Sequence, residues 1–320
     1  MEQNRWLIYA LGGGFGHLTR ACSLARAAAA HTRVSILTNS PYAELVKSAM
    51  RPLDIRALDP SITVNEGRTA VLRWLAEAKA DVLVVDTFPR GLGGELPDAL
   101  AGFSGLKVLV QRDLNPDYAA KYQLNAFIAK NYDLVLTTGD GNSGAPWLIR
   151  SQHELPERET ARHLLGVSGE RPCVAICASG NSEELAWYGA VASHLFKSCV
   201  VRCIAPVRPP NCPVECWISY FPAMDLYPGA DILIGGGGYN TVYEAAACDV
   251  PLICRPWPRL YDRQELRALG RAARIVTDPI QAAQAALDLA TAVGRKRLIS
   301  FQNGAEQAVV SVFDHSRRRF

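Results

Sequence analysis

The sequence contains no long hydrophobic run and almost no net charge. No apolar stretch in its 320 residues approaches the roughly 18 residues that a membrane-spanning helix needs, and the N-terminus leads into a predicted strand without a signal-peptide pattern. Lys and Arg number 34 against 31 Asp and Glu, a net charge of +3 that is scattered along the chain. Such a balance argues against a nucleic-acid-binding groove. We therefore expect a cytoplasmic protein that has no nucleic-acid partner.

Signatures of disulfides and metal centres are also missing. The cysteines are odd in number, nine, and most stand inside apolar runs such as Cys173–Cys177, a pattern typical of buried thiols in a reducing compartment. Cys212 and Cys216 lack the second pair, or the nearby histidines, of a zinc site. The sequence also has no Asp-x-Asp motif. We expect neither a metal nor a separate cofactor.

One cluster of like charge stands at the C-terminal end, Arg317-Arg318-Arg319. A solvated tail is the simpler interpretation of such a run. The alternative is a weak peripheral contact with anionic lipid at the inner face of the membrane. No pattern in the sequence indicates an oligomeric state.

Apolar strands and helices alternate twice along the chain. Because the strands are apolar throughout, they fit parallel sheets that helices cover on both faces. The polar segment 151–171 separates the two series, and we place a domain boundary there. The sequence predicts an α/β protein with two tandem Rossmann-like domains: residues 1–150, a linker at 151–171, residues 172–300, and a final helix and tail at 301–320.

The second series contains a glycine-rich loop, predicted to run from Gly235 to Thr241 between a strand and a helix. Four glycines without Cβ atoms, followed by the free N–H groups and positive dipole of a helix start, are typical of a phosphate site. Asn240 and Thr241 can cap that helix or donate to a ligand. Glu244 lies on the loop side, where its carboxylate suits the hydroxyls of a ribose. The alternative is a tight turn capped by Asn240.

A similar loop opens the chain, where Gly12 to His17 follows a predicted strand and precedes a helix predicted at 18–30. A dinucleotide-binding fold would need a third glycine, where His17 stands, and an acid after the second strand, where the chain has Thr38-Asn39-Ser40. The positive end of the helix dipole would keep the His17 imidazole neutral, as a general base requires. The alternative is a histidine that caps the helix.

Two further side chains follow strands of the first series. Asp86 ends the run 81–86, and Arg112 follows the strand at 107–110. Because parallel strands present their carboxyl ends at one edge of the sheet, both should lie near His17, where Asp86 could fix the ring tautomer and Arg112 could bind a phosphate or an acidic substrate. A capping or surface acid and an interdomain ion pair are the respective alternatives. Two such domains would enclose a cleft between the glycine loops.

The two loops together resemble those of the GT-B glycosyltransferases, in particular the bacterial peptidoglycan N-acetylglucosaminyltransferase group (family 28-like) and related predicted bacterial transferases. The resemblance covers nearly the whole chain. Gly12–Leu18 is similar to that family's first loop, which ends in Gly-His near the acceptor, and Val85–Phe88 is similar to a site in plant sugar transferases where an aspartate pairs with a catalytic histidine. The resulting assignments in the first domain are His17 and Asp86 as catalytic residues, and Gly13, Gly14, Gly16 and Arg112 on the acceptor side.

The second domain resembles the family's donor-binding domain. Phe221–Ile234 is similar to the segment that contacts the nucleotide base, the glycine loop to the one that holds the diphosphate, and Asp262–Glu265 to the segment that reads the donor sugar. Asn303–Ala305 resembles the start of a final helix that crosses back to the first domain. The implied donor-binding residues are Ser179, Gly180, Asn181, Phe221, Met224, Gly236, Gly237, Gly238, Tyr239, Asn240, Thr241, Glu244, Asp262, Gln264 and Glu265.

The chain also departs from the family pattern. Glycines replace the serine and basic residue that usually precede the loop glycine, and Leu266-Arg267 replaces an aromatic residue and an asparagine. The resemblance implies an inverting, metal-independent, hexosyltransferase-type enzyme that moves a sugar from a nucleotide-diphosphate donor, with uracil as the base, to an acceptor hydroxyl of unknown identity. A nucleotide-sugar hydrolase or epimerase of the same fold, and a non-catalytic sugar-nucleotide-binding protein, are the alternatives.

Overall fold

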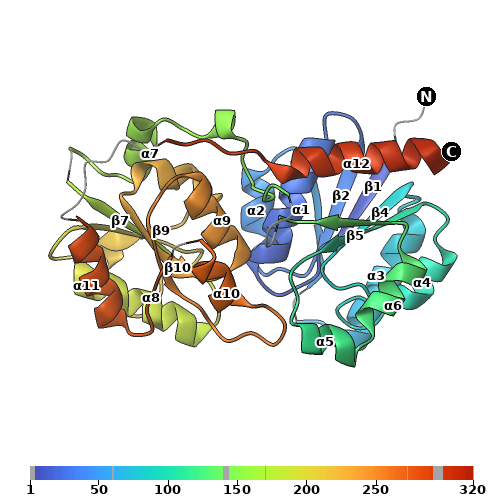
Figure 1. The fold of residues 1–320 in the computed structure, drawn as a ribbon, viewed down its shortest axis with the longest axis horizontal. Helices are drawn as coiled ribbons and strands as arrows, with labels where there is room; N and C mark the ends of the chain where they lie inside the picture. The colour runs from blue at the N-terminus through green and yellow to red at the C-terminus, as the bar shows by residue number, and fades with distance from the viewer. Residues whose placement is uncertain are drawn as a thin grey trace. The chain divides into compact units, whose positions relative to one another are not determined.

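A computed structural model describes residues 4–59, 61–139, 144–169, 171–271, 273–290 and 298–319. The chain divides into two compact units: unit 1 comprises Met1–Ile149 and Asn303–Phe320, and unit 2 comprises Arg150–Gln302. Each unit is built on one six-stranded sheet (Figure 1), and the strand pairs are parallel. The prediction of an α/β protein with two Rossmann-like sheets is confirmed.

The sheet of unit 1 has the strand order β3-β2-β1-β4-β5-β6. The chain first adds strands on one side of β1 (Arg5–Tyr9) and then returns to add β4 (Val82–Asp86) on the other side. In an open parallel sheet, such a reversal leaves a crevice at the carboxyl ends of the two strands, where ligands bind. The other strands are β2 (Arg33–Thr38), β3 (Asp54–Ala57), β5 (Leu106–Gln111) and β6 (Leu134–Thr137).

Alternation along β1 explains how helices cover both faces of this sheet. Leu7 and Tyr9 pack into a core with α3, α4 and α6, whereas Trp6 points to the opposite face and contacts Phe313 of the last helix. Successive side chains of a strand point to opposite faces, so one strand supplies both cores. The helices are α1 (Phe15–Ala28), α2 (Ala43–Ala49), α3 (Val64–Glu77), α4 (Leu96–Gly102), α5 (Pro116–Lys121), α6 (Leu124–Asn131) and α12 (Gly304–Arg319).

Helix α1 begins at Phe15 instead of the predicted Leu18, with extended Gly14 as its N-cap, so His17 lies in its first turn. Helices α5 and α6 are separate, because Gln123 between them adopts a left-handed conformation with φ of 48°. That conformation cannot continue an α-helix.

The last helix, α12, belongs to unit 1 and packs against α1 and β6. Asn303 anchors its start, since its side chain accepts a hydrogen bond from the Leu148 N–H and donates one to the Leu148 carbonyl. Helix α12 continues to Arg319, so it includes most of the segment predicted to be a tail. Arg317 and Arg318 therefore form part of its exposed last turn, where positive charge suits the negative end of the helix dipole.

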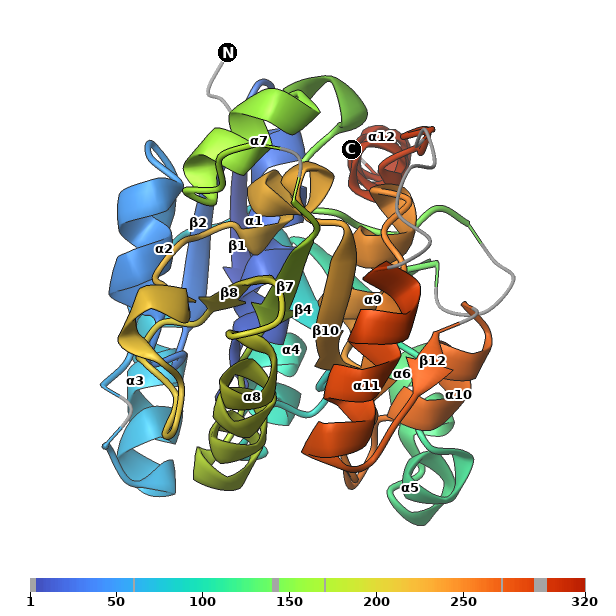
Figure 2. The ribbon, with the colours of Figure 1, turned by 90° about the vertical axis from the view of Figure 1, so that its left-hand side faces the viewer.

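The sheet of unit 2 repeats this topology, with the order β12-β11-β10-β7-β8-β9. Here the chain reverses between β7 (Cys173–Cys177) and β10 (Ile232–Gly236), which pair directly and lie side by side in Figure 2. The crevice of unit 2 is thus expected at the carboxyl ends of these two strands. The other strands are β8 (Val200–Ile204), β9 (Trp217–Ile218), β11 (Leu252–Arg255) and β12 (Arg274–Ile275).

Helices of unit 2 enclose a core in which α8 and α11 pack side by side on the sheet (Figure 2). Helix α9 begins at Tyr239 and strand β10 continues to Gly236. The loop between them is therefore only Gly237 and Gly238, shorter than the loop predicted from Gly235 to Thr241. The helices are α7 (Arg158–Leu164), α8 (Ser182–Leu195), α9 (Tyr239–Ala247), α10 (Gln264–Leu269) and α11 (Pro279–Ala290), with short 3₁₀ turns η1 (Gln152–Glu154), η2 (Val214–Cys216) and η3 (Ala223–Gly229).

The segment 151–171, predicted to be a linker, groups with unit 2. Its helix α7 packs on η3, and Arg158 and Arg162 form ion pairs with Asp231 at the start of β10. Asp231 in turn accepts the backbone N–H of Cys173, 2.8 Å away. The polar residues that suggested a linker thus serve to attach the segment to the second sheet.

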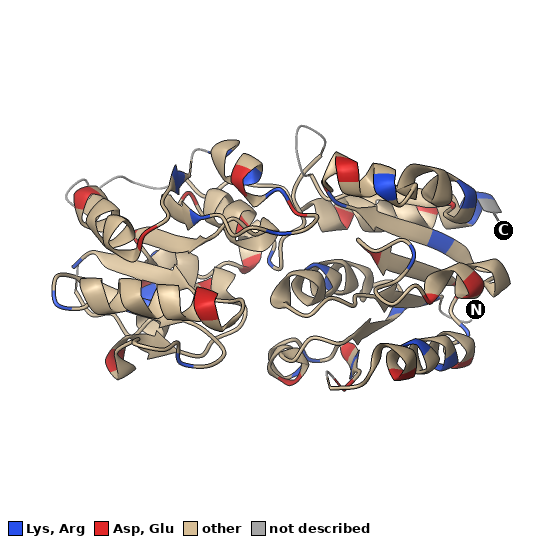
Figure 3. Ribbon diagram, turned by 90° about the horizontal axis from the view of Figure 1, so that it is seen from below, with Lys and Arg blue, Asp and Glu red and all other residues tan. Residues whose placement is uncertain are grey.

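The charged residues are spread over the protein, and nearly all of the cysteines are buried. Acidic and basic residues are interspersed over both units (Figure 3). All nine cysteines are free thiols, and all but the half-buried Cys177 are buried, as predicted. Within the described ranges, no helix is both long and apolar enough to cross a bilayer, and no three His, Cys, Asp or Glu side chains are grouped as metal ligands would be.

Candidate active site

His17, Asp86 and Arg20 meet at the crevice between β1 and β4. The Nδ1 atom of His17 lies 2.5 Å from Oδ2 of Asp86, the last residue of β4. Arg20, one helical turn after His17, donates from Nε to Oδ1 of Asp86 and from Nη2 to Oδ2, each at 2.7 Å. Its Nη2 atom also lies 3.1 Å from the Thr87 hydroxyl. The predicted histidine–aspartate pair is therefore part of a three-residue network.

Burial and charge set the protonation of this network. Burial of the ring is the largest influence on the pKa of His17 and lowers it, and the positive charges of Arg20 and Arg112 lower it further, against the opposing effect of Asp86. Burial alone would raise the pKa of the Asp86 carboxyl, but the charge of Arg20 and the hydrogen bonds from His17 and Arg20 hold it well below its usual range. The result is a neutral imidazole beside a carboxylate. Nδ1–H donates to Asp86, and Nε2 keeps its lone pair.

The backbone and one aromatic ring position His17. Gly12 has φ of 151°, and a Cβ atom there would stand 2.3 Å from Cδ2 of His17 and 2.6 Å from Nε2, so only glycine leaves room for the ring. The Asn39 side chain accepts the Gly12 N–H at 2.7 Å. Phe88 stacks on the imidazole with a centroid distance of 5.2 Å.

Sequence reasoning missed Arg20, Asn39 and Phe88. Arg20 stood inside a helix whose buried face could not be assigned in advance. Asn39 stood in the segment that had been considered only for a ribose-binding acid. The signal that could have identified Arg20 is its spacing, since residues three apart on a helix share a face.

Around His17, the other loop glycines border open space. Ideal Cβ atoms at Gly13, Gly14 and Gly16 would meet no heavy atom within 4 Å. Gly14 is the N-cap and has no side chain, so the first N–H groups of α1 need another partner. Arg112, just after β5, is half-buried, and its charge reaches His17. The predicted acceptor-side glycines thus border open space near the start of α1, and Arg112 acts on His17 through its charge.

The glycines of unit 2 are arranged differently. A Cβ atom at Gly235 would stand 2.5 Å from the Thr241 methyl, and one at Gly237 would stand 2.8 Å from both Cβ and the carbonyl oxygen of Gln264. At Gly236 the neighbours are the Tyr188 hydroxyl at 3.1 Å and the Trp257 ring at 3.4 Å. Gly238, the N-cap of α9, meets nothing within 4 Å. Three of these glycines are required by packing, and the fourth borders open space.

The polar residues after this loop lie inside α9. Asn240 occupies the first turn and Gly238 is the N-cap, without a side-chain cap, so the alternative of a turn capped by Asn240 does not apply. The Thr241 hydroxyl contacts the Cys177 thiol. Tyr239 is buried and packs against Tyr243, with ring centroids 4.6 Å apart. What this helix start presents to a ligand is therefore mainly backbone N–H groups and the half-buried Asn240.

Glu244 is a buried carboxyl group without a side-chain partner among the described residues. Its exposed fraction is 6%, and burial, with a smaller contribution from the charge of Asp225, raises its pKa to about 8. Asp225 itself is held by Arg150, at 2.7 and 2.8 Å. Of the predicted base-contacting residues, Phe221 is half-buried, whereas Met224 is fully buried in η3 and packs inside the unit.

The loop after β7 forms the other wall of the unit 2 crevice. The Asn181 side chain caps α8 by accepting the Glu184 N–H at 2.9 Å, while Ser179 is exposed. Gly180 has φ of 130°, and a Cβ atom there would stand 1.7 Å from Oε2 of Glu184. Glu184 is bound through both oxygens by Arg259, at 2.7 and 2.8 Å. Of the three predicted residues, Asn181 is thus engaged in capping.

The residues predicted to read the donor sugar are mostly engaged within the protein. Oδ1 of Asp262 accepts from Nη2 of Arg267 at 2.6 Å. Oε1 of Gln264 accepts the Trp257 N–H at 2.9 Å, and Gln264 is buried. Glu265 is exposed. The structure places Asp262 and Gln264 behind the glycine loop, where they support it.

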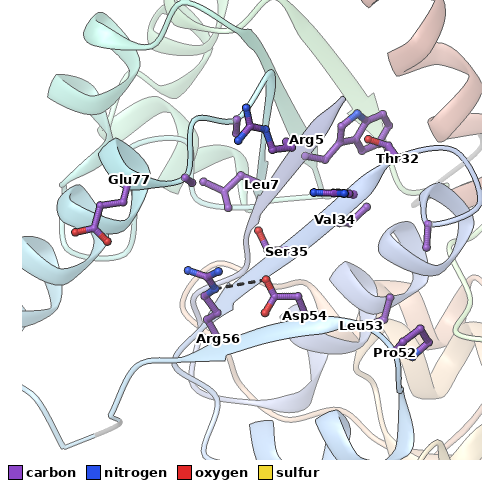
Figure 4. A pocket seen from close by; sticks show the side chains of 15 residues that line it. Arg5, Leu7, Thr32, Val34, Ser35, Pro52, Leu53, Asp54, Arg56 and Glu77 are labelled. Atoms are coloured by element: carbon purple, nitrogen blue, oxygen red, sulfur yellow. Dashed lines mark ion pairs between the residues drawn. The ribbon is translucent and has the colours of Figure 1, made fainter. Parts of the chain in front are cut away.

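A pocket of about 530 Å³ lies in unit 1 but at the opposite edge of the sheet, around the first residues of β1, β2 and β3. Figure 4 shows Arg5 and Ser35 on its wall and the ion pair of Arg56 with Asp54, which is 3.4 Å long. His17 and Asp86 are at the carboxyl ends of β1 and β4, so this pocket does not contribute to the site described above.

Comparison with known proteins identifies the fold. No family model and no curated protein sequence matches the chain, but solved structures do. The glycosyltransferase SnogD from Streptomyces nogalater has a TM-score of 0.60 and 14% identity, with 98% of this chain and 100% of that chain covered. The protein has the GT-B glycosyltransferase fold.

Two further solved structures are similar to the chain over its whole length. MurG of Acinetobacter baumannii has a TM-score of 0.55 and 15% identity, with 99% of each chain covered. A putative UDP-N-acetylglucosamine 2-epimerase from Listeria monocytogenes has a TM-score of 0.61 and 11% identity, with 100% of this chain and 98% of that chain covered. Both glycosyltransferases and an epimerase thus share the GT-B fold with this chain.

Proposed function

We propose that the protein is an inverting glycosyltransferase that moves a sugar from a nucleotide-diphosphate donor, with uracil as the expected base, to an acceptor hydroxyl. The observation that carries the proposal is the 2.5 Å contact between His17 and Asp86 at the carboxyl ends of two parallel strands, next to loop glycines that border open space. A neutral histidine whose Nδ1–H is held by a carboxylate is prepared to accept a proton at Nε2. A purely structural histidine would not need this arrangement beside three glycines that border open space.

The proposed reaction begins when Nε2 of His17 removes the acceptor hydroxyl proton. The acceptor oxygen forms a bond to the anomeric carbon as the bond from that carbon to the diphosphate oxygen breaks, and the electron pair leaves with the diphosphate. Attack opposite the leaving group inverts the anomeric centre. Asp86 stabilises the imidazolium that forms, while Arg20 keeps Asp86 ionised and correctly oriented. General-base catalysis of this kind contributes roughly a hundredfold to ten-thousandfold.

On the donor side, the proposal assigns the diphosphate to the backbone around Gly238 and the start of α9. Free N–H groups and the helix dipole stabilise the negative charge that develops on the leaving group, so the mechanism uses no metal. Glu244 is a buried acceptor for which the described part of the chain offers no side-chain hydrogen-bond donor, which supports its assignment to the ribose hydroxyls.

The fold also supports an alternative, a nucleotide-sugar epimerase or hydrolase, because an epimerase is among the structural neighbours. In that case water, or the sugar itself, takes the place of the acceptor. Incubation of the protein with UDP-sugars alone distinguishes the reactions: an epimerase or hydrolase converts the donor without acceptor, whereas a transferase consumes little. The non-catalytic alternative is a sugar-nucleotide-binding protein, which would bind the donor tightly and turn over none of a broad acceptor panel.

The first experiment is a thermal-shift screen of UDP, TDP and their sugar conjugates. A ligand that binds only the folded protein raises its stability with the logarithm of its concentration over its dissociation constant. We expect a nucleoside diphosphate to raise the melting temperature in proportion to log concentration. Failure of every nucleoside diphosphate and nucleotide sugar to shift it would refute the proposed donor site.

A further inference from the structure

Arg267 of α10 lies directly behind the short loop Gly237–Gly238. It is only 8% exposed, although arginine is seldom buried without a partner. Its Nη1 atom donates to the Gly237 carbonyl oxygen at 2.9 Å, and its Nη2 atom donates to Asp262 Oδ1 at 2.6 Å. Arg267 stands where the sequence departs from the family pattern, and its side chain bridges α10 and the loop.

This contact fixes the peptide group between Gly237 and Gly238. A trans peptide is planar, with its C=O and N–H pointing in opposite directions. Because the Gly237 carbonyl points at Arg267, the Gly238 N–H points away from α10. The peptide also cannot move towards α10, since the Cβ direction of Gly237 is already filled by Gln264.

Gly238 itself borders open space in the direction of a Cβ atom. No heavy atom lies within 4 Å of the place where a Gly238 Cβ would stand, and Gly238 is the N-cap of α9. The Gly238 N–H therefore joins the first N–H groups of α9 at a helix N-terminus, the arrangement that binds phosphate oxygens. Arg267 does not need to touch a ligand to influence it.

The charges of Arg267 and Asp262 also indicate that Arg267 acts through the loop peptide. Arg267 and Asp262 form an ion pair at 2.6 Å, so together they add little net charge to the loop. A charge-assisted hydrogen bond to the Gly237 carbonyl polarises that peptide and strengthens its N–H as a donor. Arg267 should thus orient and polarise one amide group. Its effect should be limited to a phosphate that contacts this amide.

We infer that Arg267, held by Asp262, is a positioning residue that aims the Gly238 N–H at the terminal phosphate of a nucleoside diphosphate. The inference rests on the proposed function and deepens its donor site. It also gives a chemical reason for the all-glycine loop. Arg267 of α10 orients the loop peptide, so no side chain on the loop has to do so. The inference also removes Asp262 from the residues that would read the donor sugar.

The test compares UDP with UMP, which lacks the terminal phosphate, by isothermal titration calorimetry. The variants are Arg267→Met, which removes the charge and both hydrogen bonds, Arg267→Lys, which keeps the charge but cannot span both partners, and Asp262→Asn, which leaves Arg267 in place. Arg274→Met is the matched control, because Arg274 forms only a half-exposed 3.6 Å pair with Asp288 in the same unit. Thermal unfolding of each variant verifies that it is folded.

We expect Arg267→Met to weaken UDP binding about tenfold, in line with the loss of one charge-assisted hydrogen-bond arrangement, with UMP affinity unchanged. Arg267→Lys and Asp262→Asn should lie between Arg267→Met and the wild type, and Arg274→Met should match the wild type. Equal loss of UDP and UMP affinity would make Arg267 a merely structural residue and overturn the inference, as would unchanged UDP affinity in all folded variants. If the wild-type protein binds neither nucleotide, the proposed function itself fails.

Discussion

The glycine loops after β1 and after β10 occupy equivalent places in two sheets of the same strand order, yet their glycines differ in what surrounds them. In unit 1, Gly13, Gly14 and Gly16 border open space. In unit 2, Gly235, Gly236 and Gly237 are pressed against side chains and backbone, and only Gly238 is open. One loop leaves room beside a reactive side chain, while the other holds a backbone in a fixed orientation.

The buried carboxyl groups show the same division. Asp86 is paired with a buried arginine and with His17, so its pKa is held below its usual range. Glu244 has no such partner among the described residues, and burial raises its pKa to about 8. In unit 1 the Asp86 carboxylate is thus fully paired. In unit 2 the Glu244 carboxyl group is left to accept hydrogen bonds from a ligand. This contrast is expected if unit 1 moves a proton and unit 2 binds a ligand.

The largest expected effect separates the two functions. His17→Ala should lower turnover by about a hundredfold to ten-thousandfold, the range for loss of a general base, while donor affinity measured by calorimetry stays unchanged. The control is His31→Ala, because His31 is exposed after the end of α1. Wild-type turnover in His17→Ala would end the assignment of the base to unit 1.

A second prediction contrasts the two carboxyl groups through pH. The pKa of Glu244 is raised to about 8 from an ordinary 4.5, so the wild-type protein loses stability as pH rises between these values, by about 1.4 kcal/mol for each pH unit. Glu244→Gln removes this loss, and its advantage in free energy of unfolding should grow from pH 5 to pH 8 in denaturant titrations.

Asp86→Asn is the counterpart of that variant. Because the pKa of Asp86 is lowered, its stabilisation is complete above the ordinary carboxyl range and is lost only in acid. The cost of Asp86→Asn should therefore be constant between pH 5 and pH 8. An advantage of Glu244→Gln that does not change with pH would contradict the difference between the two sites.

A third prediction exchanges glycine for alanine in the two loops. Gly237→Ala forces a methyl group against Gln264, which should lower the free energy of unfolding by about 1–3 kcal/mol, as overpacking does. Gly16→Ala meets no atom within 4 Å and lies in the first turn of α1, where alanine should stabilise the helix by roughly 0.5–1 kcal/mol. Turnover should nevertheless fall in Gly16→Ala, since the methyl group enters the space beside His17. Equal thermal stability of the two variants would remove the distinction between open and packed glycines.

The smallest expected effect concerns Arg20. Its charge contributes to the low pKa of His17, so weakening its contact in Arg20→Lys should move the acid limb of the pH–kcat/KM profile towards higher pH. Arg26→Lys on the same helix is the control. An unchanged profile in a folded Arg20→Lys protein would mean that Arg20 serves only to fill the core.

Patterns local to the chain predicted much of this architecture. Uninterrupted apolar runs such as 82–85 and Cys173–Cys177 correspond to buried parallel strands, because a strand covered on both faces must be apolar on both. The ends of helices and segments were harder to predict than the strands themselves. Helix α1 begins three residues earlier than Leu18, since glycine and phenylalanine give no strong start signal, and the polar segment 151–171 is attached to unit 2 by its arginines.

The strand–loop–helix units, and the position of His17 and Asp86 at one edge of a sheet, could be predicted from the sequence, because hydrophobic patterning and parallel strand geometry are properties of local segments. Which polar side chains are bound within the protein could be seen only in the fold. Gln264 packs against Gly237, Asp262 pairs with Arg267, and Arg20 reaches Asp86 across 66 positions of sequence. Such partners depend on how elements pack in three dimensions, and neither spacing nor composition specifies that packing.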